Sequence, residues 1–313
     1  MFSGVLAGYL ADAVFADPRR GHPVAGLGWA ATRLERYTYR DAKAAGVVHT
    51  AVLVAAVVAS GLAAQRGGGA RRFVATTVAT WAALGGTSLG RTGEQMADLL
   101  AAGDEVGARR LLPSLCGRDP ESLDSIGLTR AALESVAENT SDAQVAPLMW
   151  AMIGGAPAVL AYRAVNTLDA MIGHRNARYR RFGWAAARLD DAANYLPARA
   201  TAALVVLCAP IVHGSPRAAL CAWRRDSARH PSPNAGVVEA AFAGALGIQL
   251  GGPTRYAHEL EIRPLLGTGS PPDIGDLRRA VTLSRVVQAA TVVVPAVVIA
   301  SRSVWARSQR RRP

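Results

Sequence analysis

Five segments of this chain contain no Asp, Glu, Lys or Arg, and several approach the length of a membrane-spanning helix. They are 47–64, 73–90, 143–162, 200–216 and 286–301. A helix of about 20 apolar residues crosses the hydrocarbon core of a bilayer. One such segment could be a buried helix of a soluble protein. Five in a chain that is 50% hydrophobic predict an all-α, polytopic membrane protein with about five to six membrane helices.

The polar segments between these runs are long, and we expect them to belong to the same unit. We predict a single membrane-embedded domain over 1–313, with site chemistry in the polar regions 91–142, 163–199 and 217–285. Residues 273–313 are expected to form a C-terminal membrane helix with a basic tail. Residues 1–16 predict a short apolar helix, in which Asp12 should face a polar partner or a wet cavity because a carboxylate is costly at membrane depth.

Polar side chains are concentrated in 130–199. If 130–142 is helical, Glu134, Glu138 and Asp142 recur every four residues on one stripe, where each like-charged pair costs roughly a few tenths of a kcal/mol. A divalent cation or a cationic substrate group would offset this repulsion. Alternatively, Arg130 neutralises Glu134 and the other two carboxylates face water. The ligand-type residues that follow favour the cation.

The apolar segment 143–162 contains the sequence Gly154-Gly155-Ala156-Pro157 near its middle. These residues break or kink a helix, and irregular backbone at membrane depth is tolerated where it is buried in protein or lines a cavity. A straight helix would separate the polar groups before and after it by the full membrane. We therefore predict a re-entrant or deeply broken element that returns both groups to one side.

The polar group after this element combines carboxylates, amides and arginines. Asn166 and Asp169 are three residues apart and share a helical face, and His174 follows at the end of that helix. Arginine binds phosphate with two parallel hydrogen bonds, so the neighbouring arginines suit a phosphate group. They equally suit a lipid-facing basic patch. The arginines are Arg175, Arg178, Arg180 and Arg181.

Two proline-containing turns carry further candidate site residues. Asp17 and His22 each precede a proline, which biases them toward extended or turn conformations at the mouth of a site. The alternative is a simple helix stop followed by a basic interfacial segment. Later, the turn from His230 to Asn234 contains two prolines and leads into an apolar helix that opens at Gly236.

Several classes of function are excluded or disfavoured. The net charge of +12 comes from arginines spread over every polar loop, without interleaved aromatics, so we expect no nucleic-acid partner. Lys43 is the single lysine, so a phosphate-binding loop of the G-x-x-x-x-G-K type is absent and no other lysine could form a Schiff base. The three cysteines have no zinc-site spacing.

Four motifs together resemble one known family. They are D-P-R-R-G-H-P-V near the N-terminus, E-S-V-A-E-N-T-S-D, A-V-N-T-L-D-A-M-I-G-H-R with F-G-W-A-A-A-R-L-D-D, and H-P-S-P-N-A-G. In this order they resemble the adenosylcobinamide(-phosphate) synthase family of cobalamin biosynthesis, of the CobD/CbiB type. The resemblance extends over nearly the whole chain.

The resemblance implies an integral-membrane ligase that uses ATP and Mg²⁺. It would join (R)-1-amino-2-propanol, or its O-phosphate, to the free propionate carboxylate of the corrinoid adenosylcobyric acid. We expect it in the cytoplasmic membrane, in the lipid bilayer, with its active site facing the cytoplasm. A homo-oligomer or contacts with other cobalamin-pathway enzymes are further expectations.

Residue types then suggest roles for the candidates. For Mg²⁺ we expect Glu134, Glu138, Asp142, Asp190 and Asp191. For catalysis we expect Asp169 or His174 as the base, with Asp17 and His22 beside them. For substrate and phosphate binding we expect Arg175, Arg178, Arg188, Asn139, Asn166, His230 and Asn234. A transporter or sensor for a corrinoid or another anionic ligand is the alternative from a different class.

Overall fold

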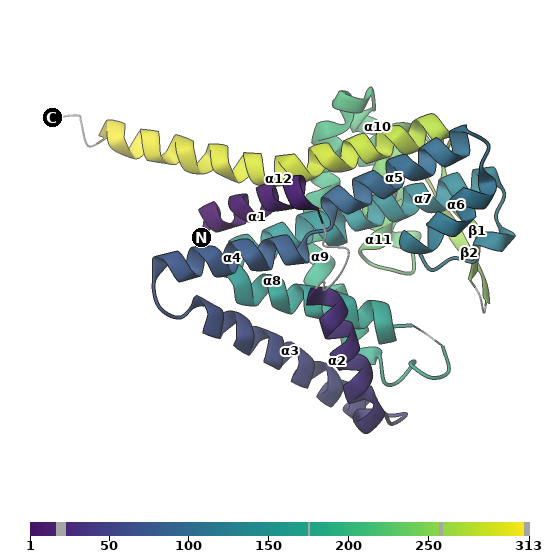
Figure 1. Cartoon of the computed structure of the whole chain (residues 1–313). Coiled ribbons are helices and arrows are strands. Elements are labelled where there is room, and N and C mark those ends of the chain that lie inside the picture. Colours follow the sequence, from purple (N-terminus) through teal and green to yellow (C-terminus); the bar gives the residue numbers. More distant parts are fainter. Residues whose placement is uncertain (17–22, 175, 257–258, 310–313) are drawn as a thin grey trace.

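The computed structural model is almost entirely helical and describes residues 1–313 except 17–22, 175, 257–258 and 310–313 (Figure 1). The first half of the described chain forms α1 (Phe2–Phe15), α2 (Pro23–Thr38), α3 (Lys43–Gln65), α4 (Gly69–Ala83), α5 (Gly86–Ala101), α6 (Glu105–Leu111) and α7 (Ser125–Thr140). The second half forms α8 (Ala146–Ile172), α9 (Trp184–Cys208), α10 (Pro216–Asp226), α11 (Ala235–Leu246), β1 (Leu250–Tyr256), β2 (Glu259–Leu266) and α12 (Ile274–Gln309).

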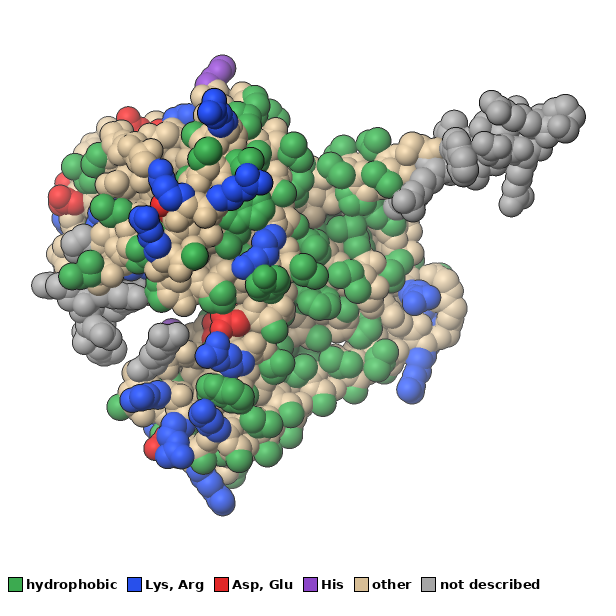
Figure 2. Space-filling model, turned by 180° about the vertical axis from the view of Figure 1, so that it is seen from behind, with side chains coloured by type: hydrophobic (Ala, Val, Ile, Leu, Met, Phe, Trp, Pro, Cys, Tyr) green, Lys and Arg blue, Asp and Glu red, His purple; other side chains and the backbone are tan. Residues whose placement is uncertain are grey.

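Four helical segments of the described chain are long and apolar enough to cross a membrane, which supports the predicted polytopic all-α class. They are Lys43–Gln65, Ser125–Ile172, Trp184–Val212 and Ile274–Val298, accompanied by the shorter apolar helices Phe2–Phe15 and Ala235–Leu246. Figure 2 shows hydrophobic side chains gathered over one part of the molecule and basic side chains beyond it on both sides. This distribution is typical of a membrane protein with polar ends.

Two of the predicted membrane segments have different boundaries in the structure. The segment 73–90 is divided, because α4 ends at Ala83 and α5 begins at Gly86. The consecutive glycines at 85 and 86 weaken helix continuation, and the Gly85 N–H donates to the Ala143 carbonyl at 3.0 Å instead. The segment 200–216 is only the end of a longer helix, since α9 begins at Trp184.

The predicted break in 143–162 is confirmed. The helix α8 is interrupted at Gly155, which has φ 65° and ψ −148°, a conformation that essentially only glycine adopts. Pro157 follows without an N–H to donate. A side chain at Gly155 would displace the amide end of Gln65, the last residue of α3. The chain therefore runs away from Asp142, turns at Gly155 and runs back to Asp169.

Asp12 in α1 is buried and has polar partners, as predicted. Its Oδ2 accepts from the Thr87 backbone N–H and hydroxyl, each at 3.2 Å, and from Gln288 Nε2 at 3.3 Å. These contacts link α1 to α5 and α12. Further along the chain, α5 and α6 flank Gly103, which has φ 72°.

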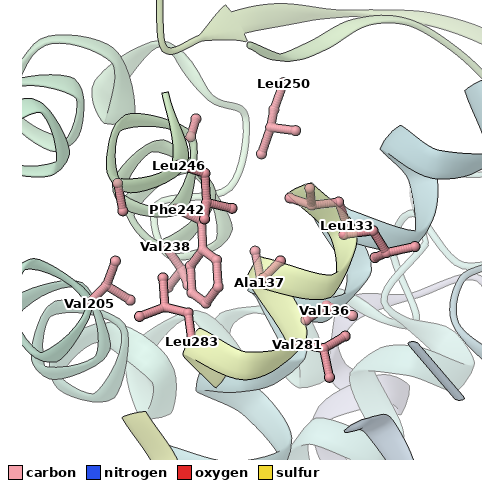
Figure 3. Close-up of a cluster of buried hydrophobic side chains, with 14 of the residues drawn as sticks. Leu133, Val136, Ala137, Val205, Val238, Phe242, Leu246, Leu250, Val281 and Leu283 are labelled. Carbon is pink, nitrogen blue, oxygen red and sulfur yellow. The ribbon is translucent and has the colours of Figure 1, made fainter. Parts of the chain in front are cut away.

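The largest hydrophobic core joins α7, α9, α11, β1 and α12. Figure 3 shows Phe242 of α11 between side chains of these elements, with Leu133 on α7, Val205 on α9 and Leu283 on α12. Every residue of α11 is buried, and Glu239 is the one charged residue among them. This packing fixes the positions of α7, α9 and α11 relative to one another, and the site described below lies on them.

A short antiparallel hairpin, β1 and β2, was not predicted from the sequence. It pairs Gly252 with Arg263, and the register shifts between Leu250 and Gly252. Gly251 and Gly252 both have φ 87°, so the first strand bends where it approaches α7. The hairpin thereby brings Arg263 close to the helices of the central core.

Candidate active site

The segments singled out in the sequence meet at a cavity of about 360 Å³. It is lined by Glu138, Asp142, Asp169, Gly173, Ala187, Arg188, Asp190, Asp191, Asn194, residues 230–235 and Arg263. In Figure 2 acidic side chains lie in a hollow between two parts of the surface, with basic side chains around it. Eight of the candidate residues therefore share one cavity although they span about a hundred positions in the sequence.

Three helical features deliver the carboxylates. Glu138 lies in the last turn of α7, and Asp142 lies in the π-helical segment Ser141–Val145 that joins α7 to α8. Such π-segments often occur at functional sites, because they turn side chains off the regular helical spacing. Asp169 returns on the second arm of α8. Asp190 and Asp191 come from the first two turns of α9.

Hydrogen bonds of two amides and a tyrosine hold the segments that carry these carboxylates. Asp190 accepts from Asn194 Nδ2 at 3.0 Å and from Asn166 Nδ2 at 3.3 Å. The Tyr162 hydroxyl lies 2.9 Å from both the Asp142 carbonyl oxygen and Asn194 Oδ1. Asn166 thus holds a carboxylate of the cavity by a hydrogen bond but does not line the cavity itself.

The charge of the cavity is unbalanced. Five carboxylates line it against two arginines, and the Arg188–Asp191 pair is 3.4 Å apart and partly exposed. Within the described residues, no three His, Cys, Asp or Glu side chains are grouped closely enough to hold a metal ion. Mg²⁺ in nucleotide sites commonly uses one or two carboxylates together with substrate phosphates and water. The lining suits that kind of site, or an ammonium group.

A second group of lining residues is built around His230 and Arg263. Arg263 Nη2 lies 2.7 Å from His230 Nε2 and 3.5 Å from Glu239 Oε1. A guanidinium only donates, so Nε2 must accept and we assign the proton of the neutral ring to Nδ1, 3.2 Å from the Ser232 carbonyl. Burial and the charge of Arg263 lower the pKa of His230 to about 4.

Glu239 lies beside Arg263, on the fully buried helix α11. Neither of its carboxylate oxygens accepts a hydrogen bond from the described residues, and His230 Nε2 is 4.0 Å from Oε2. Burial raises the pKa of Glu239 to about 8, more than the nearby Arg263 lowers it. An uncharged Glu239 leaves the positive charge of Arg263 available to the cavity.

Glu134 is separated from the other predicted metal ligands. Its Oε1 accepts the Gly251 N–H at 2.7 Å, and its Oε2 pairs with Arg118 and with Arg263, the latter at 3.4 Å. Its side chain is 2% exposed and does not line the cavity. Glu134 lies about one helical turn, or 5 to 6 Å, before Glu138 along α7, on the side of the hairpin.

Other candidates also lie away from the cavity. Asn139 donates to the Ser135 carbonyl at 3.0 Å. Arg178 donates to Glu35 at 2.8 Å and covers the Tyr39 ring at 4.2 Å. His174 is exposed and is not among the lining residues. Asp17, His22 and Arg175 lie outside the described residues.

Asn234 lines the cavity and also joins two elements. Its Nδ2 donates to the Asp191 carbonyl at 2.8 Å, and its Oδ1 accepts from Arg199 at 2.9 Å. The two-proline turn is thus fixed to α9, and His230 lines the same cavity as the carboxylates.

The sequence interpretation missed Arg118, Glu239 and Arg263. Arg118 and Arg263 occur in segments without any notable motif. Glu239 offered a signal, because it is the one charged residue in the apolar stretch from 235 to 254. A lone carboxylate in such a stretch indicates a buried polar contact.

Comparison with known proteins gives a consistent family match. The model of the family described as "CobD/Cbib protein" matches residues 5–284. "Cobalamin biosynthesis protein CobD" of Mycobacterium tuberculosis (strain ATCC 25618 / H37Rv) is 67% identical over 300 residues, with 96% of each chain covered. Proteins of the same name from Geobacter metallireducens and Stutzerimonas stutzeri are each 43% identical, over 86% and 90% of this chain and 87% and 93% of theirs. No solved structure matches the chain.

Proposed function

The chain belongs to the CobD/Cbib protein family, and we propose that it is an ATP-dependent amide ligase of cobalamin biosynthesis. Its substrates would be adenosylcobyric acid and either (R)-1-amino-2-propanol or the O-phosphate of that amine. The bond formed is an amide between the amine and the free propionate carboxylate. The product is adenosylcobinamide or its phosphate.

The observation that carries this proposal is the cavity in which both kinds of charge meet. Five carboxylates line it together with Arg188, His230 and Arg263. A cavity of about 360 Å³ can hold a propionate arm and a phosphate group, while the much larger corrin ring lies at its mouth. Cationic and anionic groups of the reactants would then find opposite charges within one cavity.

This combination of charges suits amide formation from a carboxylate. A carboxylate resists attack by an amine until one of its oxygens becomes a leaving group, so ATP must first phosphorylate or adenylate it. Arg188 and Arg263 would stabilise the negative charge of the phosphates and of the activated carboxylate. Asp169 would accept a proton from the incoming ammonium and so free its nitrogen lone pair for attack.

The carboxylates also fit Mg²⁺ bound with ATP. Glu138, Asp142, Asp190 and Asp191 are the residues that would hold it, because all four line the cavity and carry oxygen ligands. When bound, the ion would neutralise part of the phosphate charge. Glu134 is left out of this set because its carboxylate is paired with Arg118 and Arg263.

We also propose that the cavity faces the cytoplasm, where ATP is available, and that the chain lies in the cytoplasmic membrane. The described segments long enough to cross a membrane support its multi-pass character. Association into a homo-oligomer or with other cobalamin-pathway enzymes belongs to the same proposal.

Mass spectrometry tests the activity directly. Detergent-purified protein is incubated with adenosylcobyric acid, Mg-ATP and either aminopropanol or its O-phosphate. We expect an ATP-dependent mass gain of the corrinoid equal to the amine minus water, and the preferred amine identifies the substrate. Tight corrinoid binding without product, and without ATP hydrolysis that depends on both substrates, would instead favour a carrier or sensor.

A further inference from the structure

A second cavity, of about 590 Å³, lies away from the carboxylates and has a basic lining. Asp41, Lys43, Ala177, Arg180, Arg181 and Trp184 line it, and none of them lines the acidic cavity. Arg181 and Asp41 form an ion pair at 3.7 Å, with each side chain more than half exposed. Neither Lys43 nor Arg180 is paired with a carboxylate among the described residues. The cavity therefore carries an uncompensated positive charge.

This basic cavity lies where two apolar helices begin. Lys43 is the first residue of α3 and Trp184 is the first residue of α9, and both helices are long and apolar enough to cross a membrane. Lys43 Nζ lies 4.9 Å from the centre of the Trp184 ring, whose side chain is 40% exposed. Tryptophan and lysine at such a position are typical of the boundary between headgroups and acyl chains.

An apolar surface begins directly beside the cavity. Val47, Val48 and Val52 follow Lys43 along α3, and their side chains are 44%, 55% and 50% exposed. Figure 2 shows basic side chains gathered at this end of the molecule and hydrophobic side chains beyond them. A ligand with a phosphate and hydrocarbon chains could occupy both surfaces at once.

We propose that this cavity binds the headgroup phosphate of an anionic phospholipid, whose acyl chains lie along the exposed valines of α3. Arg180 and Arg181 supply guanidinium donors that match phosphate oxygens, and Lys43 adds a third positive charge. A free phosphate would use the same donors but gain nothing from the valines. This site does not depend on the proposed ligase activity.

Native mass spectrometry of the full-length chain tests the proposal. Protein stripped of lipid in detergent is titrated with phosphatidylglycerol and, separately, with phosphatidylcholine of the same acyl chains. The site variant is K43Q/R180Q/R181Q. The matched control is R66Q/R71Q/R72Q, which removes three exposed arginines at the opposite end of α3. Thermal unfolding of both variants shows whether they remain folded.

We expect the wild type and the control variant to bind the first phosphatidylglycerol at least about tenfold more tightly than phosphatidylcholine, and the site variant to lose this preference. The milder Lys43→Gln should lose part of it. Equal weakening in both triple variants, or no lipid preference in the wild type, would overturn the site. Displacement of phosphatidylglycerol by millimolar inorganic phosphate would identify a free-anion site instead.

Discussion

Glu134 and Glu138 lie one helical turn apart in α7, yet their surroundings differ completely. Glu134 is buried between Arg118, Arg263 and the Gly251 N–H, whereas Glu138 lines the cavity with the other carboxylates. Removing one partner of a buried ion pair leaves an uncompensated charge, which costs far more than removing an exposed one. The two residues should therefore respond to substitution in different ways.

Replacing Glu134 with Gln should destabilise the fold. Arg118 and Arg263 would lose their shared carboxylate, and we expect a loss of about 3–5 kcal/mol in the free energy of unfolding. Denaturant or thermal unfolding in detergent measures it. Glu138→Gln is the control, with little expected change in stability. An unchanged unfolding midpoint in Glu134→Gln would contradict the structural role.

Replacing Glu138 with Gln, or Asp142 with Asn, should abolish amide formation while the protein stays folded. We expect turnover to fall at least about 100-fold, because each change removes a negative charge from the site proposed for the ion and the ammonium. Product is quantified by the corrinoid mass assay. Glu121→Gln, at an exposed carboxylate outside the cavity, should retain full activity. Normal turnover in the cavity variants would reject the proposed metal site.

The low pKa of His230 predicts a specific loss of stability in acid. The folded ring has a pKa of about 4 and the unfolded ring about 6.5, so between these pH values only the unfolded state takes up the proton. Stability from this residue is present above pH 6.5 and falls by up to about 3 kcal/mol as pH drops toward 4.

Comparison with His230→Gln isolates this effect, since the other acid-sensitive groups remain. Denaturant unfolding should show the wild type losing more stability than the variant between pH 6.5 and 4. Glu239 acts in the opposite direction: its raised pKa of about 8 reduces stability as pH rises from 4.5 to 8. A parallel series with Glu239→Gln separates the two. Identical pH profiles for wild type and His230→Gln would contradict the buried, neutral ring.

At the scale of elements, the break in α8 does most to build the site. The arm from Asp142 to Gly155 and the arm from Gly155 to Asp169 are each about 20 Å long at 1.5 Å per residue. Because the arms are nearly equal in length, Asp142 and Asp169 lie at nearly the same distance from the break. The hairpin β1–β2 adds the opposite charge, because its Arg263 reaches Glu134, His230 and Glu239 together.

Gly155→Ala should weaken this arrangement. Alanine resists φ 65° with ψ −148°, which costs about 1–3 kcal/mol, and its Cβ would displace the end of the Gln65 side chain. We expect a lower unfolding midpoint and loss of amide formation together. Gly26→Ala in α2, where a Cβ meets no atom within 4 Å, is the control and should be neutral or slightly stabilising. A fully active, equally stable Gly155→Ala would show that the break is not required.

At the scale of the whole molecule, the proposed orientation places the two ends of α3 on opposite faces of the membrane. Lys43 lies at the end that carries the basic cavity, and the connection between α3 and α4 lies at the other end. Lys43, Arg180 and Arg181 line the cavity at the first end, and basic residues favour the cytoplasmic side of a membrane.

Cysteine labelling tests this orientation. Ala70→Cys, made with Cys221→Ser, should react in intact cells with a membrane-impermeant maleimide. In the wild type the exposed Cys221 of α10 should react only after permeabilisation. The reverse pattern would contradict a cytoplasmic site, and labelling of both from one side would contradict the crossing of α3.

The sequence by itself determined the class of protein, the broken helix and the two polar groups that meet. These features depend on local chemistry: charge-free length, glycine and proline conformations, and carboxylates at helical spacing. The family resemblance also followed from the motifs alone, and the match over residues 5–284 supports it.

Only the tertiary structure decided which carboxylate does what. Glu134 and Arg263 are 129 positions apart, and no local periodicity links them. The hairpin that carries Arg263 depends on packing against α7 and α11, and the division of 73–90 depends on a hydrogen bond from Gly85 to Ala143. Contacts between distant segments set burial and pairing, and these set the charge that each side chain presents to the cavity.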